Sequence, residues 1–516
     1  MKKTFLSGAG VLALSVIFAK VLGAAYRIPL ANILGTDGMG LYQFVYPVFA
    51  LLLTLSSGAM PTAVSITVSK RLANGDTEGA KRSFNVILRL AIIVGCVGTG
   101  VLLILAYPLS KLQSAEAFLG YLTIAPAVFI VTVISAFRGY FMGNKNMVPS
   151  SVSQITEGIV KLGVGISLSL LLLPYGLKYA VAGALFGVVA SEIVTLAVMF
   201  FIYLKEKGGF VKIKLSAEKE SVKEVAKIIT PLILCGIILP LSQFLDSIFI
   251  VNLLRIRSQE NATGLYGLYG GAVTPLINLP VMVCITLGIA VTPQMVEGKE
   301  KHDVDFIMDK CNVATKLTFM LGVPFVFAFT FMSEGIVSLL FPALGGEKLA
   351  LAGSLLRISS SGVLGLSLFQ IYSAMLQGLN KTKVPVVIMS VCMAVKTVIY
   401  ALLTPYVGIK GVAIGSVIGY GLSGVIIMIY FFNYVRVGDN LMKNVSLITL
   451  CGVIMGFVIF MSDKFTAGRV GVVIVGVVSA AVYAIALFTL KVFSREELFS
   501  MPLGKYLVAI DKKIHG

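Results

Sequence analysis

The sequence has no tryptophan, only two histidines and few charged side chains. Charged residues make up 13% of the 516 residues, whereas soluble domains carry about 25%. The hydrophobic fraction of 57% and the mean hydropathy of +0.96 exclude a soluble domain and indicate a polytopic membrane protein. Without tryptophan, tyrosine has to supply the aromatic side chains at the membrane interfaces.

Sequence patterns for catalysis and metal binding are missing as well. The six cysteines are scattered without Cys-x-x-Cys spacing, so we predict neither a disulfide framework nor a metal site. His302 and His515 lie in a predicted loop and in the tail, which removes histidine catalysis within the membrane. There is no Walker A motif and no loop long enough to house an enzyme domain. We therefore predict that the protein is not an enzyme and uses no cofactor, with coupling to Na⁺ or H⁺ left open.

Long apolar runs predict the fold class. Runs able to span about 30 Å of hydrocarbon occur fourteen times along the chain. They cover residues 5–29, 39–69, 84–108, 117–141, 152–173, 178–204, 225–254, 268–296, 312–332, 349–378, 384–404, 410–434, 444–462 and 469–493. The expected fold is an all-α polytopic membrane protein with fourteen transmembrane helices.

The distribution of lysine and arginine predicts the orientation in the membrane. With the amino terminus inside, about 27 cationic residues fall in cytoplasmic segments and about 8 in outer loops. We therefore expect both termini on the cytoplasmic side. The formal charge of +18 has the same explanation, so we expect membrane lipids and no nucleic acid as partners.

An internal repeat predicts two parallel bundles. Residues 143–149 precede a helix with Lys161 at its middle, and the similar residues 378–385 precede a helix with Lys396 at its middle. Six helices separate the copies, so both copies have the same orientation. Two-bundle transporters bind substrate near the midplane and expose it alternately to each side. We expect an N-terminal six-helix bundle (1–204), a cytoplasmic basic linker (205–224), a C-terminal six-helix bundle (225–434), and helices 13 and 14 with a cytoplasmic tail (435–516).

Charged residues inside the predicted spans mark the candidate site. A lysine or arginine at the bilayer centre costs about 2.5–3.5 kcal/mol, so each needs a partner, water or a ligand. Lys20 and Arg27 lie on one face of the first helix, about 10.5 Å apart along its axis. The excess of cations over carboxylates predicts an anionic substrate. The other charged residues within the spans are Arg89, Glu157, Lys161, Glu192, Asp246, Lys316, Arg357 and Lys396.

Each carboxylate within the spans has two possible roles. Glu157 and Lys161 are four residues apart, so we expect them to pair on their own helix, either structurally or as a switchable gate. Glu192 and Asp246 either hold a coupling cation or neutralise the lysines.

The remaining cations differ in their positions along the helices. Arg89 and Lys316 lie near helix ends, where we expect the long side chains to reach the membrane interface. Lys396 has no carboxylate one turn away, which favours a place in a cavity.

Several motifs resemble those of the stage V sporulation protein B family. They are Lys20-Val-Leu-Gly-x-x-x-Arg27, Arg138-Gly-Tyr-Phe-Met-Gly143, Leu173-Pro-Tyr-Gly176 and Gln377-Gly-Leu-Asn380. This family is related to the bacterial lipid II flippases and belongs to the multidrug/oligosaccharidyl-lipid/polysaccharide (MOP) exporter superfamily. The chain departs from the lipid II flippases in helix 1, where their second arginine falls at the position of Tyr26.

The resemblance implies a flippase that moves an undecaprenyl-pyrophosphate-linked saccharide, lipid II or a related polysaccharide precursor, across the bacterial cytoplasmic membrane by alternating access. Its partners would be the lipid-linked oligosaccharide, membrane lipids and cell-wall synthesis proteins, and we expect a monomer. The substrate-binding residues would be Lys20, Arg27, Lys161, Arg357 and Lys396, and the gating or ion-coupling residues Glu157, Glu192 and Asp246.

Two other functions stay open. One is a cation-coupled multidrug or toxin exporter of the same superfamily, with Asp246 and Glu192 as the ion site. The other is a membrane glycosyltransferase or polymerase, which would need a larger carboxylate-bearing outer loop than this chain offers. The sequence gives neither the sugar nor the driving force.

Overall fold

All regular structure that the chain shows is helical. The computed structural model describes residues 2–207, 229–230, 233, 236–256, 261–435, 440–462 and 468–492. Within these ranges there is no β-strand, and thirteen helices are long and apolar enough to cross a membrane. The predicted fold class, an all-α polytopic membrane protein, is confirmed.

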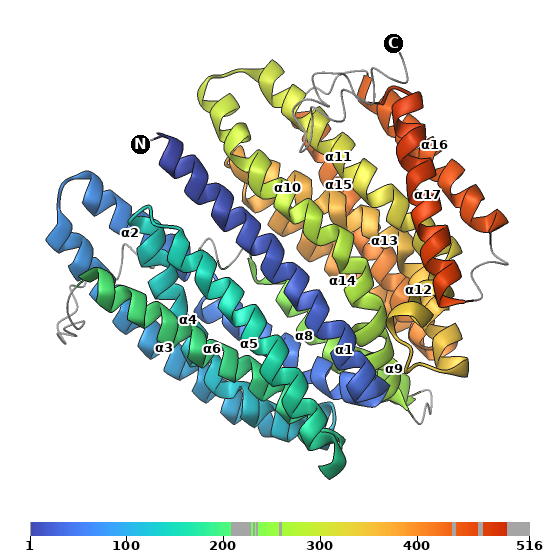
Figure 1. Ribbon diagram of the computed structural model, residues 1–516, viewed down its shortest axis with the longest axis horizontal. Coiled ribbons are helices and arrows are strands. Elements are labelled where there is room, and N and C mark those ends of the chain that lie inside the picture. Colours follow the sequence, from blue (N-terminus) through green and yellow to red (C-terminus); the bar gives the residue numbers. More distant parts are fainter. Residues whose placement is uncertain are drawn as a thin grey trace. The chain divides into compact units, whose positions relative to one another are not determined.

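The chain divides into two compact units, unit 1 (Met1–Gly271) and unit 2 (Ala272–Gly516). Their elements are labelled in Figure 1 where there is room. Unit 1 contains α1 (Lys2–Ser56), α2 (Met60–Ala73), α3 (Thr77–Leu112), η1 (Ala115–Ala117), α4 (Phe118–Gly143), α5 (Val148–Leu172), η2 (Leu173–Tyr175), α6 (Leu177–Lys207), α8 (Ile238–Ile256) and α9 (Ala262–Leu268). The chain leaves unit 1 within the π-helical turn η3 (Tyr269–Val273). Unit 2 contains α10 (Thr274–Glu300), α11 (Val304–Phe331), α12 (Ser333–Leu340), α13 (Gly346–Gly378), α14 (Lys383–Val407), α15 (Ile409–Tyr434), α16 (Asn440–Met461) and α17 (Arg469–Thr489).

The first two predicted spans form one helix, α1, that is interrupted at Gly35. Gly35 has φ 64° and ψ −169°, a conformation that glycine adopts and L side chains avoid. The first candidate span, Ala25–Ala73, has 49 residues and would be about 74 Å long, more than twice the hydrocarbon thickness. Divided at Gly35, the thirteen candidate spans give the fourteen that the sequence predicts.

Helix α8 belongs to unit 1, although the sequence placed residues 225–254 at the start of the second bundle. Helix α8 packs against α1 and α9, and it is also hydrogen-bonded to the buried Gln113, which follows the end of α3. The Gln113 amide donates to the Ser247 hydroxyl of α8 at 2.8 Å and accepts from the Tyr121 hydroxyl at 2.5 Å. The Gln113 carbonyl also accepts from Arg255 of α8. The grouping of the other helices into six-helix bundles stays a prediction.

The turn between α2 and α3 in unit 1 is repeated between α10 and α11 in unit 2. Gly75 and His302 both have positive φ, 75° and 54°. Asp76 and Asp303 follow them, and each carboxylate accepts the backbone N–H three residues later, at 2.7 Å and 2.9 Å. Such a cap satisfies one of the free N–H groups at a helix start.

The turn after α4 is likewise repeated after α13. Lys145 and Asn380 both adopt the left-handed conformation, with φ 61° and 63°. In each turn the backbone N–H of this residue donates to the carbonyl three residues earlier, and the N–H of the next residue donates to the carbonyl five residues earlier. This is the Schellman pattern that ends a helix. Lys161 and Lys396 each lie sixteen residues further on, within α5 and α14. The predicted repeat is therefore visible in the backbone of both units.

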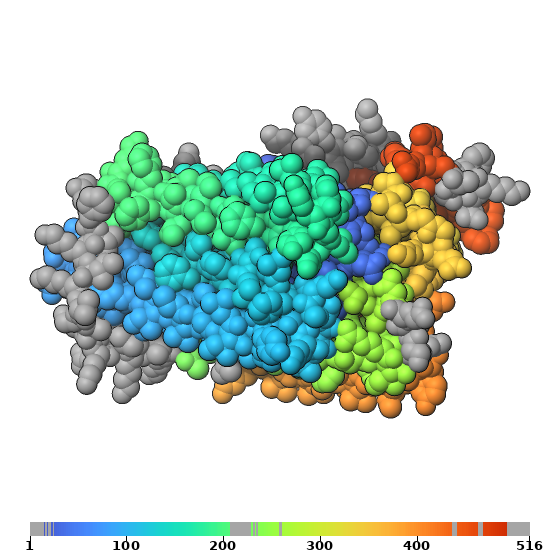
Figure 2. Space-filling view, turned by 90° about the horizontal axis from the view of Figure 1, so that it is seen from below, coloured from blue at the N-terminus to red at the C-terminus, as the bar shows by residue number. Residues whose placement is uncertain are grey.

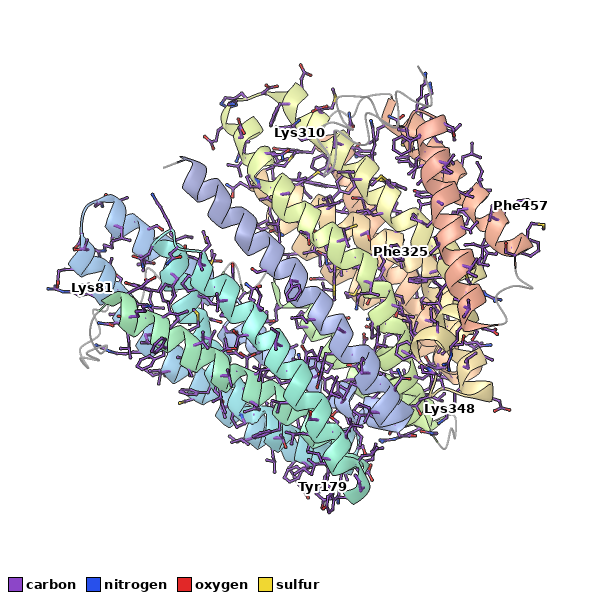
Figure 3. The ribbon with its side chains drawn as sticks, viewed as in Figure 1. Lys81, Tyr179, Lys310, Phe325, Lys348 and Phe457 are labelled. Atoms are coloured by element: carbon purple, nitrogen blue, oxygen red, sulfur yellow. The ribbon has the colours of Figure 1, made fainter. Side chains whose placement is uncertain are left out.

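Each unit has turns at two opposite ends. Figure 3 shows Lys81, near the start of α3, and Tyr179, near the start of α6, at opposite ends of unit 1. In unit 2, Lys310 and Lys348 also lie at opposite ends. The charge distribution predicts this alternation, because Lys81 and Lys310 belong to expected cytoplasmic segments and Lys348 to an expected outer loop.

Helix α3 separates an apolar surface from a packed core. Figure 2 shows α3 along the visible face of unit 1. On this helix, Ile93 and Val97 are each 60% exposed and Ile104 is 76% exposed. On the other side of the helix, Phe84 packs edge-on against Phe137 of α4, with ring centres 5.5 Å apart. An exposed apolar surface of this extent fits a lipid environment.

Candidate functional site

In unit 1, Arg27 and Lys161 lie against the same aromatic ring. The guanidinium carbon of Arg27 is 5.3 Å from the centre of the Tyr46 ring, and Lys161 Nζ is 5.5 Å from it. Lys161 Nζ is also 5.3 Å from the centre of the Tyr26 ring. Cation–π contacts contribute about 0.5–1 kcal/mol when exposed and about 2 kcal/mol when desolvated. We refer to Arg27, Lys161, Tyr26 and Tyr46 as the cation–tyrosine cluster.

Helices α1 and α5 position this cluster. Arg27 and Tyr26 precede the interruption of α1 at Gly35, Tyr46 follows it, and Lys161 comes from α5. The buried Tyr42 lies one turn before Tyr46 and stacks on it, with ring centres 5.4 Å apart and planes 16° apart. Stacking on a buried neighbour fixes the ring that both cations contact.

Tyr26 is held by three helices. Its hydroxyl donates to the Ala184 carbonyl of α6 at 3.0 Å. A Cβ at Gly165 of α5 would lie 2.9 Å from the Tyr26 ring, and a Cβ at Gly187 of α6 would lie 2.3 Å from the Gly165 Cα. Both positions therefore require glycine. The sequence marked Tyr26 only as the departure from the lipid II flippases, and the structure places its ring beside the Lys161 ammonium.

Glu157 pairs with Arg138 of α4 and not, as the sequence predicted, with Lys161. The Arg138 guanidinium donates to the Glu157 carboxylate at 3.0 Å and to the Ser153 hydroxyl at 2.9 Å. Ser153 and Glu157 are one turn apart on α5, so they match the fork of a guanidinium, whereas Lys161 lies over the tyrosine rings. Arg138 is a site residue that the sequence reasoning missed, because it was left out of the charged residues within the spans, although it lies near the end of the predicted run 117–141 and begins the motif 138–143.

Glu192 completes the charged groups of this site. It lies on α6, is 5% exposed, and is close enough to Glu157, Arg138 and Lys161 for electrostatic interaction. The structure thus brings Arg27, Lys161, Glu157 and Glu192 together in unit 1, while their predicted roles in binding and gating stay predictions.

For two other candidate residues of unit 1, the structure gives the position on a helix but few contacts of the side chain. The side chain of Lys20 lies outside the described residues, although its backbone is part of α1. Asp246 lies on α8, close enough to Tyr266 for electrostatic interaction. Their predicted roles stay predictions.

Unit 2 contains Lys396 and Arg357. Lys396 is 2% exposed, and its Nζ is 5.8 Å from the centre of the Tyr420 ring of α15. Each unit therefore holds its mid-helix lysine over a tyrosine ring of another helix. Arg357 lies on α13 with an exposed side chain.

The expectation that the side chain extends to the membrane interface is wrong for Lys316, which is buried, whereas Arg89 is partly exposed and its expectation stays a prediction. Lys316 is only 8% exposed, and the Nε and Nη1 atoms of Arg89 are buried. Both residues lie twelve positions inside their helices, α3 and α11, and the Lys316 side chain turns into the helix packing.

The site in unit 1 is suited to an anion. Arg27, Lys161 and Arg138 supply three positive charges against the two carboxylates of Glu157 and Glu192. The tyrosine rings stabilise two of the cations without neutralising them, which leaves N–H donors for a ligand. Among the residues that the structure describes, no group of three or more His, Cys, Asp and Glu side chains could hold a metal ion.

Two family profiles match the chain. The profile described as Polysaccharide biosynthesis protein matches residues 5–299, and the MatE profile matches residues 231–403. Together they cover most of both units.

Curated relatives and solved structures agree with these profile matches. Stage V sporulation protein B of Bacillus subtilis (strain 168) is 28% identical over 344 residues, covering 64% of this chain and 66%, just under two thirds, of that protein. Lipid II flippase MurJ of the same organism is 24% identical over 443 residues, covering 81% of each. A structure titled lipid II flippase MurJ, inward closed conformation, has a TM-score of 0.73 at 17% identity and covers 93% of this chain and 98% of that chain. At that identity the likeness shows the fold alone.

Proposed function

Because this chain belongs to the polysaccharide biosynthesis protein family of the MOP superfamily, we propose that it is a flippase for an undecaprenyl-pyrophosphate-linked saccharide. The family makes it a multi-pass membrane transporter and not an enzyme. The substrate would be lipid II or a related polysaccharide precursor, moved from the cytoplasmic to the outer leaflet. Coupling to membrane potential, Na⁺ or H⁺ is open.

The observation that carries this proposal is the pair of cations on the Tyr46 ring. A pyrophosphate presents several anionic oxygens, which the planar fork of Arg27 and the point charge of Lys161 would bind through charge-assisted hydrogen bonds. A carboxylate partner would compete with the substrate for those donors, whereas a tyrosine ring does not. Lys20, Arg357 and Lys396 are proposed as further substrate-binding residues.

Glu157, Glu192 and Asp246 are proposed as gating or ion-coupling residues. Glu157 already has a partner in Arg138, so its charge is balanced until that pair opens. Protonation of Glu192 or a cation bound near it would remove negative charge beside Lys161 and raise the affinity of the cluster for an anion. The transported anion and the coupling cation would then favour each other's binding.

The test is transport of a fluorescent lipid-linked saccharide by the purified protein in proteoliposomes. We expect Arg27→Ala and Lys161→Ala each to slow translocation by about tenfold or more, since each loses a charge-assisted hydrogen bond. Lys178→Ala is the matched control, because Lys178 also lies over a tyrosine ring, Tyr179 at 5.1 Å, but in a predicted outer loop. Wild-type rates in the Arg27→Ala, Lys161→Ala double variant would rule the proposal out.

A second function has one observation in its favour. The MatE profile covers residues 231–403, which include Asp246. A cation-coupled multidrug exporter would transport cationic dyes in the same proteoliposomes and would not respond to lipid-linked saccharides. Dye transport that is lost in Asp246→Asn would favour this alternative over the flippase.

A further inference from the structure

Helices α3 and α11 carry the same short motif at the same place. It reads Asn85-Val-Ile-Leu-Arg89-Leu90 in α3 and Asn312-Val-Ala-Thr-Lys316-Leu317 in α11. Arg89 and Lys316 each follow the first residue of their helix by twelve positions. The two helices also start with the same capped turn, so the internal repeat extends to this buried cation.

Three buried polar atoms of the α3 copy lack partners among the described residues. Arg89 Nε and Nη1 and Asn85 Oδ1 are buried and make no hydrogen bond to any part of the chain that the structure describes. Asn85 and Arg89 are four residues apart, so they lie on one face of α3. Two of the three guanidinium nitrogens are thus buried without a partner in a side chain that is only partly exposed, whereas buried polar groups in native proteins normally have partners.

Among the described elements, those that pack on α3 place no carboxylate beside Arg89. The 3₁₀-helix η1 contacts α3 and carries Glu116, but it follows the far end of α3, which lies 23 residues beyond Arg89, or about 34 Å along the axis. Helices α2 and α4 pack against α3, and neither contains an aspartate or a glutamate. The one acidic residue of α3 is Glu78, eleven residues before Arg89, or about 16 Å along the axis. Helix α1 also packs on α3, and its one acid, Asp37, lies beside Thr36 and next to Gly264 of α9. An anion for Arg89 therefore has to come from outside these helices.

The α11 copy differs in one respect. Asn312 Oδ1 is also buried and without a hydrogen bond among the described residues, but Lys316 makes interactions of its own within the structure. Of the two copies, only the cation in unit 1, Arg89, has buried nitrogens without a partner among the described residues.

We propose that Arg89 and Asn85 form a binding site for the phosphate group of a membrane lipid, apart from the cation–tyrosine cluster. The guanidinium fork matches two phosphate oxygens. The Asn85 Nδ2 can donate to a third oxygen, and its Oδ1 can accept from a hydroxyl next to the phosphate. Arg89 lies about 18 Å from the start of α3, on the side that the charge distribution predicts to be cytoplasmic. Two lipids supply such a group there, a bulk anionic phospholipid and the lipid-linked saccharide. The second source rests on the proposed function.

Native mass spectrometry of the full chain in neutral detergent tests this site. Phosphatidylglycerol, undecaprenyl pyrophosphate and uncharged diacylglycerol are titrated separately onto the wild type and its variants. We expect Arg89→Gln to weaken binding of at least one phosphate lipid by about tenfold or more and to leave diacylglycerol unchanged. Asn85→Asp keeps the arginine and supplies an internal counter-ion, so it should weaken phosphate binding as much. Lys111→Gln, on the same helix, is the control that should bind as the wild type does.

The outcomes separate the lipid sources from each other and this site from the proposed function. Loss of phosphatidylglycerol binding assigns the site to bulk phospholipid, and loss confined to undecaprenyl pyrophosphate assigns it to the transported lipid. Arg27→Ala should keep phosphate-lipid binding at Arg89 even where it abolishes transport. Equal binding of both phosphate lipids by wild type, Arg89→Gln and Asn85→Asp would overturn the proposal. If Arg89→Gln does not fold, Asn85→Asp decides alone.

Discussion

At the scale of single residues, one aromatic ring stabilises two cations within the membrane, a role that a carboxylate usually has. Tyr46 lies within 5.5 Å of both Arg27 and Lys161 and is backed by the buried Tyr42. Electrostatic attraction to the ring face lowers the cost of holding the cations in the membrane. The charges still keep their hydrogen-bond donors, which an anionic ligand needs.

We predict that Tyr46→Leu lowers the free energy of unfolding by about 1–2 kcal/mol and slows transport, because both cation–π contacts disappear. Tyr46→Phe keeps the ring face and should behave more like the wild type. Thermal unfolding in detergent and transport in proteoliposomes measure the two effects. Tyr107→Leu, which removes the ring beside the exposed Lys111, serves as the control for loss of a cation–π contact elsewhere. Equal behaviour of Tyr46→Leu and Tyr46→Phe would contradict the role of the ring.

The sequence marked Arg27, Lys161, Glu157 and Glu192 as candidate residues, but it marked neither Arg138 nor the tyrosine rings that contact the cations. Arg27, Lys161 and Glu192 stand out because a charge within an apolar run is costly. Tyrosines are common in membrane helices, so nothing in the sequence distinguished Tyr26 and Tyr46 from aromatic residues that face lipid. Which carboxylate pairs with which cation depends on helix rotation, which spacing along one helix cannot give.

At the scale of helices, close packing around the repeat lysines depends on small residues. A Cβ at Gly419 of α15 would lie 2.6 Å from the Lys396 Cβ and 3.1 Å from the Cys392 carbonyl of α14. A Cβ at Gly421, on the same helix, would meet no atom within 4 Å. The two glycines therefore differ in packing while sharing a helix.

We predict that Gly419→Ala lowers the free energy of unfolding by about 1–3 kcal/mol, because α15 has to move away from α14. Gly421→Ala should raise it by about 0.5–1 kcal/mol, because alanine is the better helix former where space is open. Unfolding temperatures of the two variants under identical detergent conditions provide the comparison. A stabilised Gly419→Ala would show that the two helices separate at no cost.

Helix positions were predictable because each span has to cover the hydrocarbon core. The helix boundaries were less predictable, because α1 continues through the gap expected between residues 29 and 39 and is interrupted at Gly35. Helix α8 is joined to unit 1 by packing against α1 and α9 and by the buried bonds of Gln113, a residue that no periodicity marks. The sequence repeat, in contrast, predicted matching turns in both units because the turn residues are local signals.

At the scale of the whole molecule, the alternation of turns gives each unit two chemically different ends. The membrane orientation itself is proposed from the positive charge of one set of turns. The same set contains the capped turns before α3 and α11, so both copies of the repeat should face the cytoplasm with them.

We predict that single cysteines at Asn74 and Lys301 react with a membrane-impermeant maleimide from the cytoplasmic side only. Cysteines at Lys178 and Lys348 should react from the outside only, because Lys178 lies beside Tyr179, at the opposite end of unit 1 from Lys81, and Lys348 lies at the opposite end of unit 2 from Lys310. The six native cysteines are replaced by alanine first. Labelling of all four positions from one side would contradict the alternation, and a complete exchange of sides would reverse the proposed orientation.

The absence of tryptophan has a spectroscopic consequence at the Tyr46 ring. A Tyr46→Trp variant would contain the only indole of the whole chain, with both cations beside it. Its emission would report the polarity of that one position without interference from any other tryptophan. The arrival of an anionic headgroup at the two cations could then be followed in real time, in unlabelled lipid, by fluorescence alone.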